Sequence, residues 1–407
     1  MASRRLSRAA AAGDVGAVDA LLREGADPGF QVRPRFRSFE PRLCHAAHAH
    51  RHPLARRARF SLVGGGARRD LSDLSDLSDP APGGRLPSLL PAPVSQDRKG
   101  VTPLMLACEG GHVEVVRRLL AAGAPWNELD NDNHCAGEWA SASGHGELAH
   151  MLIEHAVQAE LVLGVVARRD REPDLSYLAT PVRYDGDDKL LDEDNDAVMM
   201  SWEAPLMRLH ARVICAAKGD VLNVGFGMGI IDGYIADENK TRSHTIIEAH
   251  PDVYAHMGRR GWMKKKNVRV EFGRWQDVLN AIADANDALP GGVSNENARL
   301  FDGVFFDTYG EEWDDMREFH ALLPRVMRPG GVYSYFNGLA PDNIFFHTVY
   351  CRLAAKELGR LGFETSFDVV PIDTKSDEIW KGVKRRYWWG DTYFLPTCVL
   401  SGGTEGG

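Results

Sequence analysis

The chain has 407 residues and a formal net charge of −9, and 44% of its residues are hydrophobic and 26% are charged. A chain of this length and composition can fold into two domains, and its negative balance gives no basic footprint for direct nucleic-acid binding. Its six cysteines include no CxxC pair, and no apolar run approaches the ~18 residues of a membrane span. A disulfide framework, a zinc framework and membrane insertion are therefore not expected.

Three segments in the first 156 residues share one repeat pattern. Residues 102–124 read TPLMLACEGGHVEVVRRLLAAGA, which predicts a Thr-Pro turn, a short helix, a Gly-Gly-His break and a second helix that ends at glycine. The pattern recurs earlier over residues 6–28 and, more loosely, over residues 135–156. It is typical of ankyrin repeats, whose stacked helix pairs form an extended surface that commonly binds protein. We expect such repeats over residues 1–31 and 97–160.

Residues 32–96 interrupt the repeats. They are rich in arginine, proline and histidine and have neither a helical nor a strand period. Removing them would join the first two repeats at the usual ankyrin spacing. Two interpretations stay open: a low-complexity insertion in a surface loop, or a retained intron in the gene model. The histidines of this segment could bind a metal ion, but non-functional composition is the favoured interpretation: His45, His48, His50 and His52.

Residues 161–196 form an acid-rich connection, which we interpret as a linker and a lid segment over a cofactor. We expect the domain boundary near residues 160–175 and a second domain over residues 197–407.

The second domain opens with a hydrophobic strand and a glycine-rich turn, VLNVGFGMGI, in which Gly225, Gly227 and Gly229 alternate with other residues. Glycines let the backbone approach a ligand and leave N–H groups facing it at the start of the next helix. The dinucleotide fingerprint would require glycine at Ile230, so a nicotinamide dinucleotide is disfavoured.

Three further elements complete a nucleoside site. The segment HTIIE predicts a strand that ends at Glu248, where a carboxylate can accept hydrogen bonds from both ribose hydroxyls. Trp275 and Gln276 follow the third strand and would lie near an adenine, and FDGVFFDTY predicts a strand that ends at Asp307. The glycine-rich turn with a glutamate at the end of the next strand suits S-adenosylmethionine, whose ribose is free and which has no pyrophosphate.

The remaining segments fit an open α/β sheet. Residues 323–337 predict a helix, a Pro-Gly-Gly turn and a fifth strand, and the tail predicts a final strand pair. The expected fold class is thus α plus α/β, with N-terminal ankyrin repeats followed by a Rossmann-like class I S-adenosylmethionine-dependent methyltransferase domain.

A series of motifs supports a closer comparison. In chain order these are SWEAPLM, VGFGMGI, TIIEAH, GRWQDV, FFDTYG and RPGGVYSYFN. The series resembles guanidinoacetate N-methyltransferase, and with the repeats in front the chain resembles the fungal protein arginine N-methyltransferase 2 family everywhere except residues 32–96. This resemblance implies methyl transfer to the δ-nitrogen of an arginine, with a large-subunit ribosomal protein as the substrate type. Protein docking on the ankyrin surface and residence in cytoplasm and nucleus are the corresponding expectations.

The resemblance also implies which residues form the cofactor site. One departure is Asn223, which stands where many relatives carry an acidic residue that would meet the amino end of the cofactor. Without the resemblance, Met199 and Met207 would be interpreted as core residues. The implied cofactor-binding residues are Tyr177, Met199, Met207, Gly225, Phe226, Gly227, Met228, Gly229, Ile230, Ile231, Glu248, Ala249, His250, Trp275, Gln276 and Asp307.

Glu203 and Asp307 match the acids that hold the guanidino group in the resembling family. A guanidinium is always charged in proteins, and carboxylates can clamp its fork, orient one nitrogen and take the released proton. The alternative for Glu203 is an acid in a helix first turn, stabilised by the helix dipole. The acids after Asp307 either attract a basic peptide or belong to a solvated helix start: Glu311, Glu312, Asp314 and Asp315.

Two other functions remain as alternatives. A small-molecule guanidino methyltransferase would share the second domain but would have no use for a protein-binding surface. A non-catalytic ankyrin adaptor with a vestigial methyltransferase fold would not need the intact glycine turn and acids.

Overall fold

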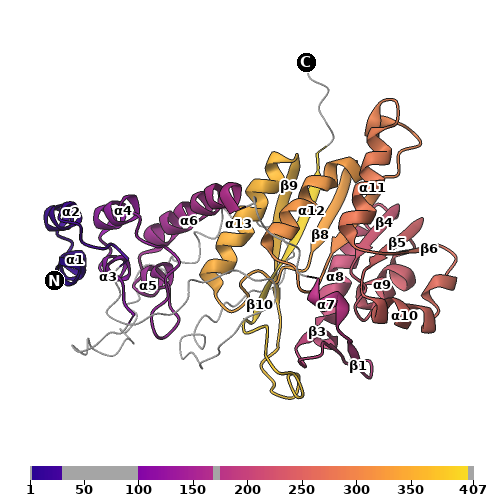
Figure 1. Cartoon of the computed structure of the whole chain (residues 1–407), viewed down its shortest axis with the longest axis horizontal. Helices are drawn as coiled ribbons and strands as arrows, with labels where there is room; N and C mark the ends of the chain where they lie inside the picture. Colours follow the sequence, from indigo (N-terminus) through magenta and orange to yellow (C-terminus); the bar gives the residue numbers. More distant parts are fainter. Residues whose placement is uncertain (1, 30–99, 168–174, 402–407) are drawn as a thin grey trace, which may run out of the picture. The chain divides into compact units, whose positions relative to one another are not determined.

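The computed structural model describes residues 2–29, 100–167 and 175–401, shown in Figure 1. The chain divides into two compact units with a boundary between Val165 and Val166. The segment 32–96 and its histidines lie outside the described residues.

The first unit consists of helix pairs at the positions that the repeat pattern predicts. Thr102 caps the second pair, because its Oγ1 accepts the N–H of Met105 at 3.2 Å, and Pro103 occupies the first helical position. The last helix runs to Ala167, past the predicted end of the repeats at residue 160. The pairs are α1 (Ala2–Ala11) with α2 (Val15–Arg23), α3 (Pro103–Glu109) with α4 (Val113–Ala121), and α5 (Ala136–Ala142) with α6 (Gly146–Ala167).

Histidines at the turns connect successive repeats. His112 Nε2 lies 3.2 Å from the carbonyl oxygen of Ala11, and His145 Nε2 lies 3.3 Å from that of Glu109. Gly13 has a φ of 70°, and a Cβ there would overlap the ring of His112. The contact that each of these histidines makes with the preceding repeat therefore explains why the Gly-His pattern recurs.

The second unit contains a seven-stranded sheet of order β6-β5-β4-β7-β8-β10-β9. The first five strands of this order are parallel, and β10 is antiparallel to both β8 and β9. The predicted open sheet with a closing strand pair is confirmed. The strands are β4 (Asp220–Val224), β5 (Ser243–Glu248), β6 (Val268–Phe272), β7 (Phe301–Phe306), β8 (Met327–Tyr335), β9 (Phe363–Pro371) and β10 (Thr392–Leu400).

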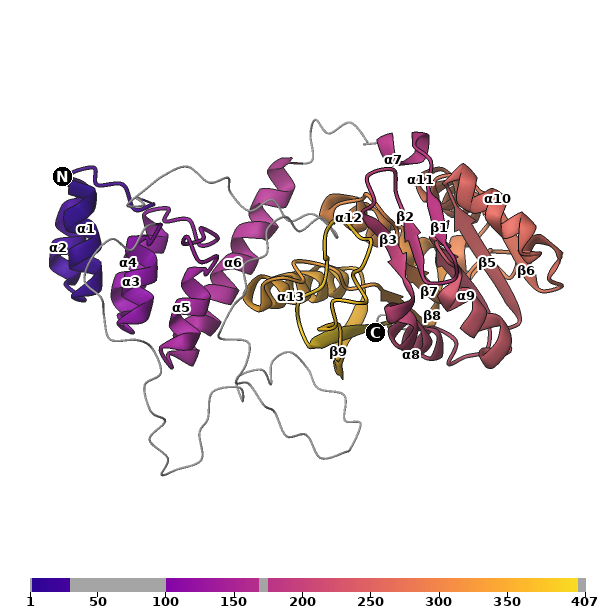
Figure 2. The same cartoon turned by 90° about the horizontal axis from the view of Figure 1, so that it is seen from below.

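Helices cover both faces of this sheet. α8 packs on β7, β8 and β10, whereas α12 packs on β8 from the other side (Figure 2). The strands between them are buried, which is the usual state of parallel strands. The helices are α7 (Ser176–Ala179), α8 (Ala204–Ile214), α9 (Ile230–Tyr234), α10 (Pro251–Arg259), α11 (Trp275–Asp287), α12 (Trp313–Val326) and α13 (Ile344–Arg360), with 3-10 turns at Ser201–Glu203, Trp262–Lys264 and Gly292–Ser294 and a π turn at Ile235–Asn239.

The Pro-Gly-Gly sequence at residues 329–331 differs from its prediction. The sequence suggests a turn between a helix and a strand, but β8 already begins at Met327, and these residues lie within it. The pairing of β7 with β8 shifts between Phe301 and Gly303, so the extra residues form an irregularity inside the ladder.

The winding of the sheet reverses between β4 and β7, which are adjacent although β5 and β6 separate them in sequence. In open α/β sheets ligands bind at the carboxyl ends of the strands at such a switch point. The site of interest is therefore expected after Val224 and Phe306, the last residues of these strands.

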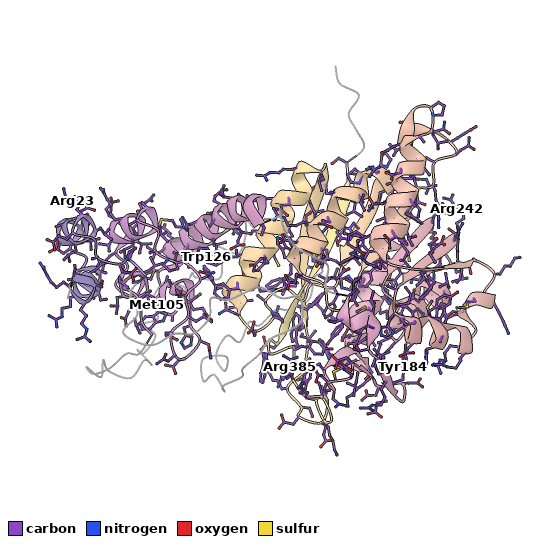
Figure 3. All side chains as sticks on the ribbon, in the orientation of Figure 1. Arg23, Met105, Trp126, Tyr184, Arg242 and Arg385 are labelled. Carbon is purple, nitrogen blue, oxygen red and sulfur yellow. The ribbon has the colours of Figure 1, made fainter. Side chains whose placement is uncertain are left out.

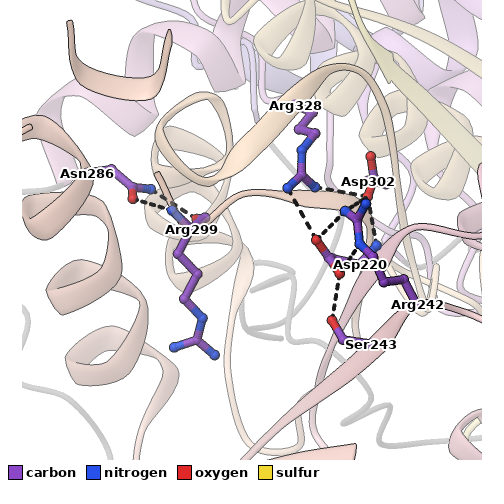
Figure 4. Close-up of polar contacts among 7 residues, drawn as sticks. All are labelled: Asp220, Arg242, Ser243, Asn286, Arg299, Asp302 and Arg328. Atoms are coloured by element: carbon purple, nitrogen blue, oxygen red, sulfur yellow. Dashed lines mark hydrogen bonds and ion pairs between the residues drawn. The ribbon is translucent and has the colours of Figure 1, made fainter. Parts of the chain in front are cut away.

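The amino ends of the central strands are held together by a charge cluster (Figure 4). Asp220 accepts hydrogen bonds from Arg242 Nε and Ser243 Oγ, both at 2.8 Å. Asp302 accepts from Arg328 Nη1 at 2.9 Å and from the N–H of Asp220 at 2.7 Å. This network joins the starts of β4, β5 and β7. The site is expected at the other end of these strands, where their carboxyl ends lie.

A small antiparallel sheet begins in the last part of the predicted acidic linker, residues 161–196, and its third strand follows the linker. It comprises β1 (Arg183–Asp185), β2 (Lys189–Leu191) and β3 (Ala197–Met200). The connection between β9 and β10, termed the 372–391 segment, is bound to it: Arg385 pairs with Asp196, and the N–H of Lys384 donates to the carbonyl of Asn195 at 2.8 Å. Arg385 is labelled on this segment in Figure 3.

Within residues 2–29, 100–167 and 175–401, no helix is long and apolar enough to cross a membrane. The same residues contain no group of three or more histidine, cysteine or acidic side chains arranged to hold a metal ion. The five cysteines of this part of the chain are free and buried: Cys108, Cys135, Cys215, Cys351 and Cys398.

Candidate active site

A cavity opens at the switch point, where the carboxyl ends of β4, β5 and β7 meet β3 and the 372–391 segment. It brings together residues that the sequence analysis selected from distant parts of the chain. The predicted residues that line it are Tyr177, Met199, Glu203, Gly225, Gly227, Glu248, Ala249, Trp275, Gln276 and Asp307.

The glycine-rich turn has the left-handed backbone that its sequence suggests, with φ values of 91°, 53° and 73° at Gly225, Gly227 and Gly229. A Cβ at Gly225 would overlap the backbone carbonyl oxygen of Asp307. The N–H of Asp307 also donates to the carbonyl of Val224 at 3.0 Å. The glycine at 225 is thus required for close approach of the Asp307 backbone, in addition to any role toward a ligand.

Glu248 connects two walls of the cavity through backbone hydrogen bonds. Its Oε2 accepts the N–H of Phe226 at 2.9 Å, and its Oε1 accepts the N–H of His250 at 2.6 Å. These bonds lower the pKa of the carboxyl, yet burial dominates and raises it. Phe226 and His250, both predicted as cofactor residues, do not line the cavity; through their backbones they hold Glu248, which does.

The other predicted residues outside the cavity wall lie in or near the core. Met207 is fully buried within the core cluster, as the core interpretation of this methionine expects. Met199 instead lines the cavity, and its Sδ accepts the N–H of Met228 at 3.3 Å. The predicted residues that do not line the cavity are Met207, Phe226, Met228, Gly229, Ile230, Ile231 and His250.

Asn223 is fully buried beneath the glycine turn. Its Nδ2 donates to the carbonyl of Gly225 at 2.9 Å and to both carboxylate oxygens of Asp232, at 2.9 and 3.0 Å. It does not line the cavity. In this chain a buried acid therefore lies next to the amide, on α9, and the pair supports the turn from below.

Glu203 and Asp307 face the same cavity from different elements. Glu203 closes the 3-10 turn before α8 and is 3% exposed, and Asp307 follows β7. Burial raises the pKa of both carboxyls, and the proximity of Asp307 raises that of Glu203 further. Hydrogen bonds from the Tyr387 hydroxyl and the N–H of Met200 act in the opposite direction on Glu203. Two enclosed carboxyls that resist ionisation are suited to a cation, which would lower both pKa values.

Glu203→Gln is expected to stabilise the fold above about pH 4, the range in which an unfolded glutamate ionises. Since the folded pKa of Glu203 is raised, the wild type loses stability as the pH rises from the unfolded pKa through the folded one, whereas glutamine carries no such cost. Thermal unfolding of both proteins from pH 5 to 8 measures this. The difference in Tm should grow with pH in favour of the variant. A constant difference would show that ionisation of Glu203 does not destabilise the fold.

Glu311, whose role the sequence analysis left open, lines the cavity. Its carboxylate accepts hydrogen bonds from Trp275 Nε1 at 2.7 Å, from Gln276 Nε2 at 3.0 Å and from Thr308 Oγ1 at 2.6 Å. It lies before α12 and lines the cavity, so it is not part of a solvated helix start. It binds the two residues expected near an adenine to the loop that carries Asp307.

Several other wall residues were missed by the sequence analysis. The most consequential is Tyr387, which lies 184 residues from Glu203 in sequence and donates its hydroxyl to that carboxylate. No local pattern marks it, because two tryptophans follow it directly and give the same aromatic signal. The wall residues that were not selected as site residues are Leu175, Leu178, Ala197, Val198, Val224, Ile247, Val253, Gly273, Arg274, Thr308, Tyr309, Gly310, Glu311, Asp315, Phe336 and Tyr387.

Two family models match the two units of the chain. Residues 169–356 match the family model described as guanidinoacetate N-methyltransferase, and residues 85–162 match the model of ankyrin repeats in three copies. Among solved structures, an O-methyltransferase, TomG from Streptomyces achromogenes in complex with SAM, matches at 15% identity and a TM-score of 0.34, covering 56% of this chain and 96% of that one.

Three curated relatives bear the name protein arginine N-methyltransferase 2. The Aspergillus oryzae protein is 34% identical over 70% of this chain and 77% of its own length. The Kluyveromyces lactis protein is 34% identical over 74% and 87%, and the Cryptococcus neoformans protein is 32% identical over 76% and 89%. The similarity thus extends over most of both chains. The chain belongs to the protein arginine N-methyltransferase 2 family and is an ankyrin-repeat methyltransferase.

Proposed function

We propose that this protein transfers a methyl group from S-adenosylmethionine to the guanidinium of an arginine in a protein substrate. The observation that carries the proposal is the acid pair: Glu203 and Asp307 face one cavity together with the glycine turn and Glu248. A site for a nucleoside-bearing cofactor and a site for a cation are therefore adjacent.

The residues of the cavity fit S-adenosylmethionine. Glu248 has carboxylate lone pairs beyond those used by two backbone N–H groups, and ribose hydroxyls are suitable donors to them. The turn at Gly225 and Gly227 allows close backbone approach, and Trp275 with Gln276 offers a ring and an amide to a nucleobase. When bound, this cofactor supplies an electrophilic methyl group on a sulfonium.

The acid pair supplies the rest of the chemistry. An arginine guanidinium entering the cavity favours ionisation of Glu203 and Asp307, and the ionised carboxylates hold its planar fork and turn one nitrogen toward the methyl carbon. As the N–C bond forms, the C–S bond breaks and its electrons stay on sulfur. The nitrogen then loses one proton, for which the carboxylates are the nearest bases.

The finer specificity is part of the same proposal. We infer the δ-nitrogen as the acceptor, a large-subunit ribosomal protein as the substrate and cytoplasm and nucleus as the compartments. These assignments rest on the family resemblance of the motifs and, for the compartments, on the reduced-thiol cysteine pattern. The ankyrin unit supports a protein substrate, since stacked repeats commonly dock protein.

Incubation of the purified chain with labelled S-adenosylmethionine tests the substrate class. Label is expected in ribosomal protein and not in guanidinoacetate, and mass-spectrometric fragmentation should locate it on the internal nitrogen of arginine. Label in guanidinoacetate alone would favour a small-molecule guanidino methyltransferase. No cofactor binding in calorimetry would favour the non-catalytic adaptor.

Glu311→Ala is expected to weaken S-adenosylmethionine binding by about tenfold, because hydrogen bonds to a carboxylate hold Trp275 and Gln276 in place. Isothermal titration calorimetry measures the loss. Glu318→Ala is the matched control, since it removes an exposed acid from the adjacent helix α12. Equal affinities for the two variants would contradict a positioning role of Glu311.

A further inference from the structure

We propose that Tyr387 is a positioning residue for methyl transfer, which holds one carboxylate oxygen of Glu203 in the cavity wall and leaves the other for the guanidinium. The inference deepens the proposed function and rests on it, since it assumes that Glu203 meets the acceptor. It assigns a role to a residue of the 372–391 segment, far in sequence from the rest of the site.

The hydrogen bonds around Tyr387 have a defined direction. Trp202 Nε1 lies 2.9 Å from the Tyr387 hydroxyl oxygen, and an indole N–H can only donate. The hydroxyl oxygen therefore accepts from Trp202, and its own proton is directed to Glu203 Oε1. The same Oε1 accepts the N–H of Met200 at 3.1 Å. Within the described residues no hydrogen bond is made to Oε2, so Oε1 carries the internal contacts and Oε2 remains for a ligand.

The ring of Tyr387 is fixed by packing. It is 6% exposed, and its centroid lies 5.7 Å from that of Trp202 and 5.1 Å from that of Trp380. The neighbouring Arg385 pairs with Asp196 and so attaches this part of the chain to the small sheet. The hydroxyl therefore has one defined position relative to Glu203, which preorganises the carboxylate before substrate arrives.

The groups around Glu203 give the direction in which its pKa should change when the Tyr387 hydroxyl is removed. Asp307, from the end of β7, raises the pKa of Glu203, and the hydrogen bonds from Tyr387 and Met200 lower it. Burial raises the pKa of Tyr393, from β10, and both carboxylates lie close enough to raise it further. Among these groups, Tyr387 and Met200 are the donors to Glu203, and only the tyrosine donates through a side chain. Loss of its hydroxyl should raise the pKa of Glu203 and move ionisation to higher pH.

The test is Tyr387→Phe in the full chain, which keeps the ring and removes the hydroxyl. We expect kcat/KM for the protein substrate at neutral pH to fall about 10- to 100-fold, the range for a hydrogen bond to a charged group. The acidic limb of the kcat/KM profile should move up by about one pH unit. The Kd for S-adenosylmethionine should be unchanged, because the hydroxyl that is removed binds Trp202 and Glu203, and Glu203 is assigned to the guanidinium.

Tyr335→Phe is the matched control. Tyr335 is also fully buried, in β8, but its hydroxyl has no hydrogen-bond partner within the described residues, so its removal should leave the pH profile in place. If Tyr387→Phe fails to fold, Trp202→Phe serves instead, since it removes the donor that orients the hydroxyl and should shift the limb in the same direction.

Glu203→Gln separates the two levels of the proposal. If this variant loses turnover but Tyr387→Phe keeps the wild-type acidic limb and kcat/KM, the positioning role is wrong and the acid clamp stands. If Glu203→Gln itself keeps wild-type turnover, the acid clamp fails. A shift of the limb in Tyr387→Phe together with loss of turnover in Glu203→Gln is the result that supports both.

Discussion

Asp307→Asn is expected to lower kcat by about 10³-fold or more, the scale seen when a group that stabilises charge in the transition state is removed. Asparagine has the shape of aspartate, so the close approach to Gly225, which involves the backbone of residue 307, should persist. The side chain loses its charge and its ability to take a proton. Single-turnover kinetics with labelled S-adenosylmethionine and the protein substrate measure the effect.

Affinity for S-adenosylmethionine should stay within about threefold of the wild type, since the cofactor contacts proposed for Glu248, Trp275 and the glycine turn are untouched. A second readout follows from the charges. Because Asp307 raises the pKa of Glu203, its neutralisation should lower the pH at which Glu203 ionises. Wild-type turnover in Asp307→Asn would disprove the acid clamp, and a large loss of cofactor affinity would assign Asp307 to cofactor binding instead.

Gly225→Ala is expected to be the most destabilising single-residue change at the site, by on the order of 3 kcal/mol or more. Two costs add: the left-handed backbone with a φ of 91°, and the overlap of a Cβ with the carbonyl oxygen of Asp307. Relief of the overlap would move the end of β7 away from β4. The variant should therefore lose both cofactor binding and turnover, with a marked drop in Tm.

Gly261→Ala is the control that measures the cost of a left-handed backbone alone, without an overlap. Gly261 has a φ of 79°, and a Cβ there would have no atom within 4 Å, so the expected loss is only about 1–2 kcal/mol and activity should be retained. Chemical denaturation of the two variants gives the difference. If both lose the same free energy of unfolding, the close approach of Asp307 to the turn contributes nothing to stability.

The outline of the site is accessible from sequence because its main parts are local. A glycine turn after a buried strand, an acid at the end of the next strand and an aspartate at the end of a fourth all appear as short patterns. Parallel strands in one sheet place their carboxyl ends at one edge, so residue order alone assigns Gly225, Glu248 and Asp307 to one site. The structure brings all three to the same cavity.

Other positions required the packing of the chain. The residues 226–231 form a continuous motif, yet the structure turns Phe226 and Ile231 into the core, where they are 1% exposed. Met207 is likewise buried, because the inner face of α8 packs on the sheet. Periodicity cannot distinguish a core residue from a cavity residue when both lie on the buried side of an element.

The family resemblance, and not local spacing, selected Glu203 and Asp307 as the acids for a guanidinium. By itself, the sequence determined the repeat unit and the strand and helix series of the second unit. Each of these follows from residues close together in the chain, where spacing and residue type carry the physical information. Only the tertiary structure decided that Tyr387 meets Glu203, that Glu311 holds Trp275 and that Gly225 makes room for Asp307. These contacts join segments up to 184 residues apart. They depend on how the 372–391 segment and the loop after β7 pack against the sheet, which no local pattern encodes.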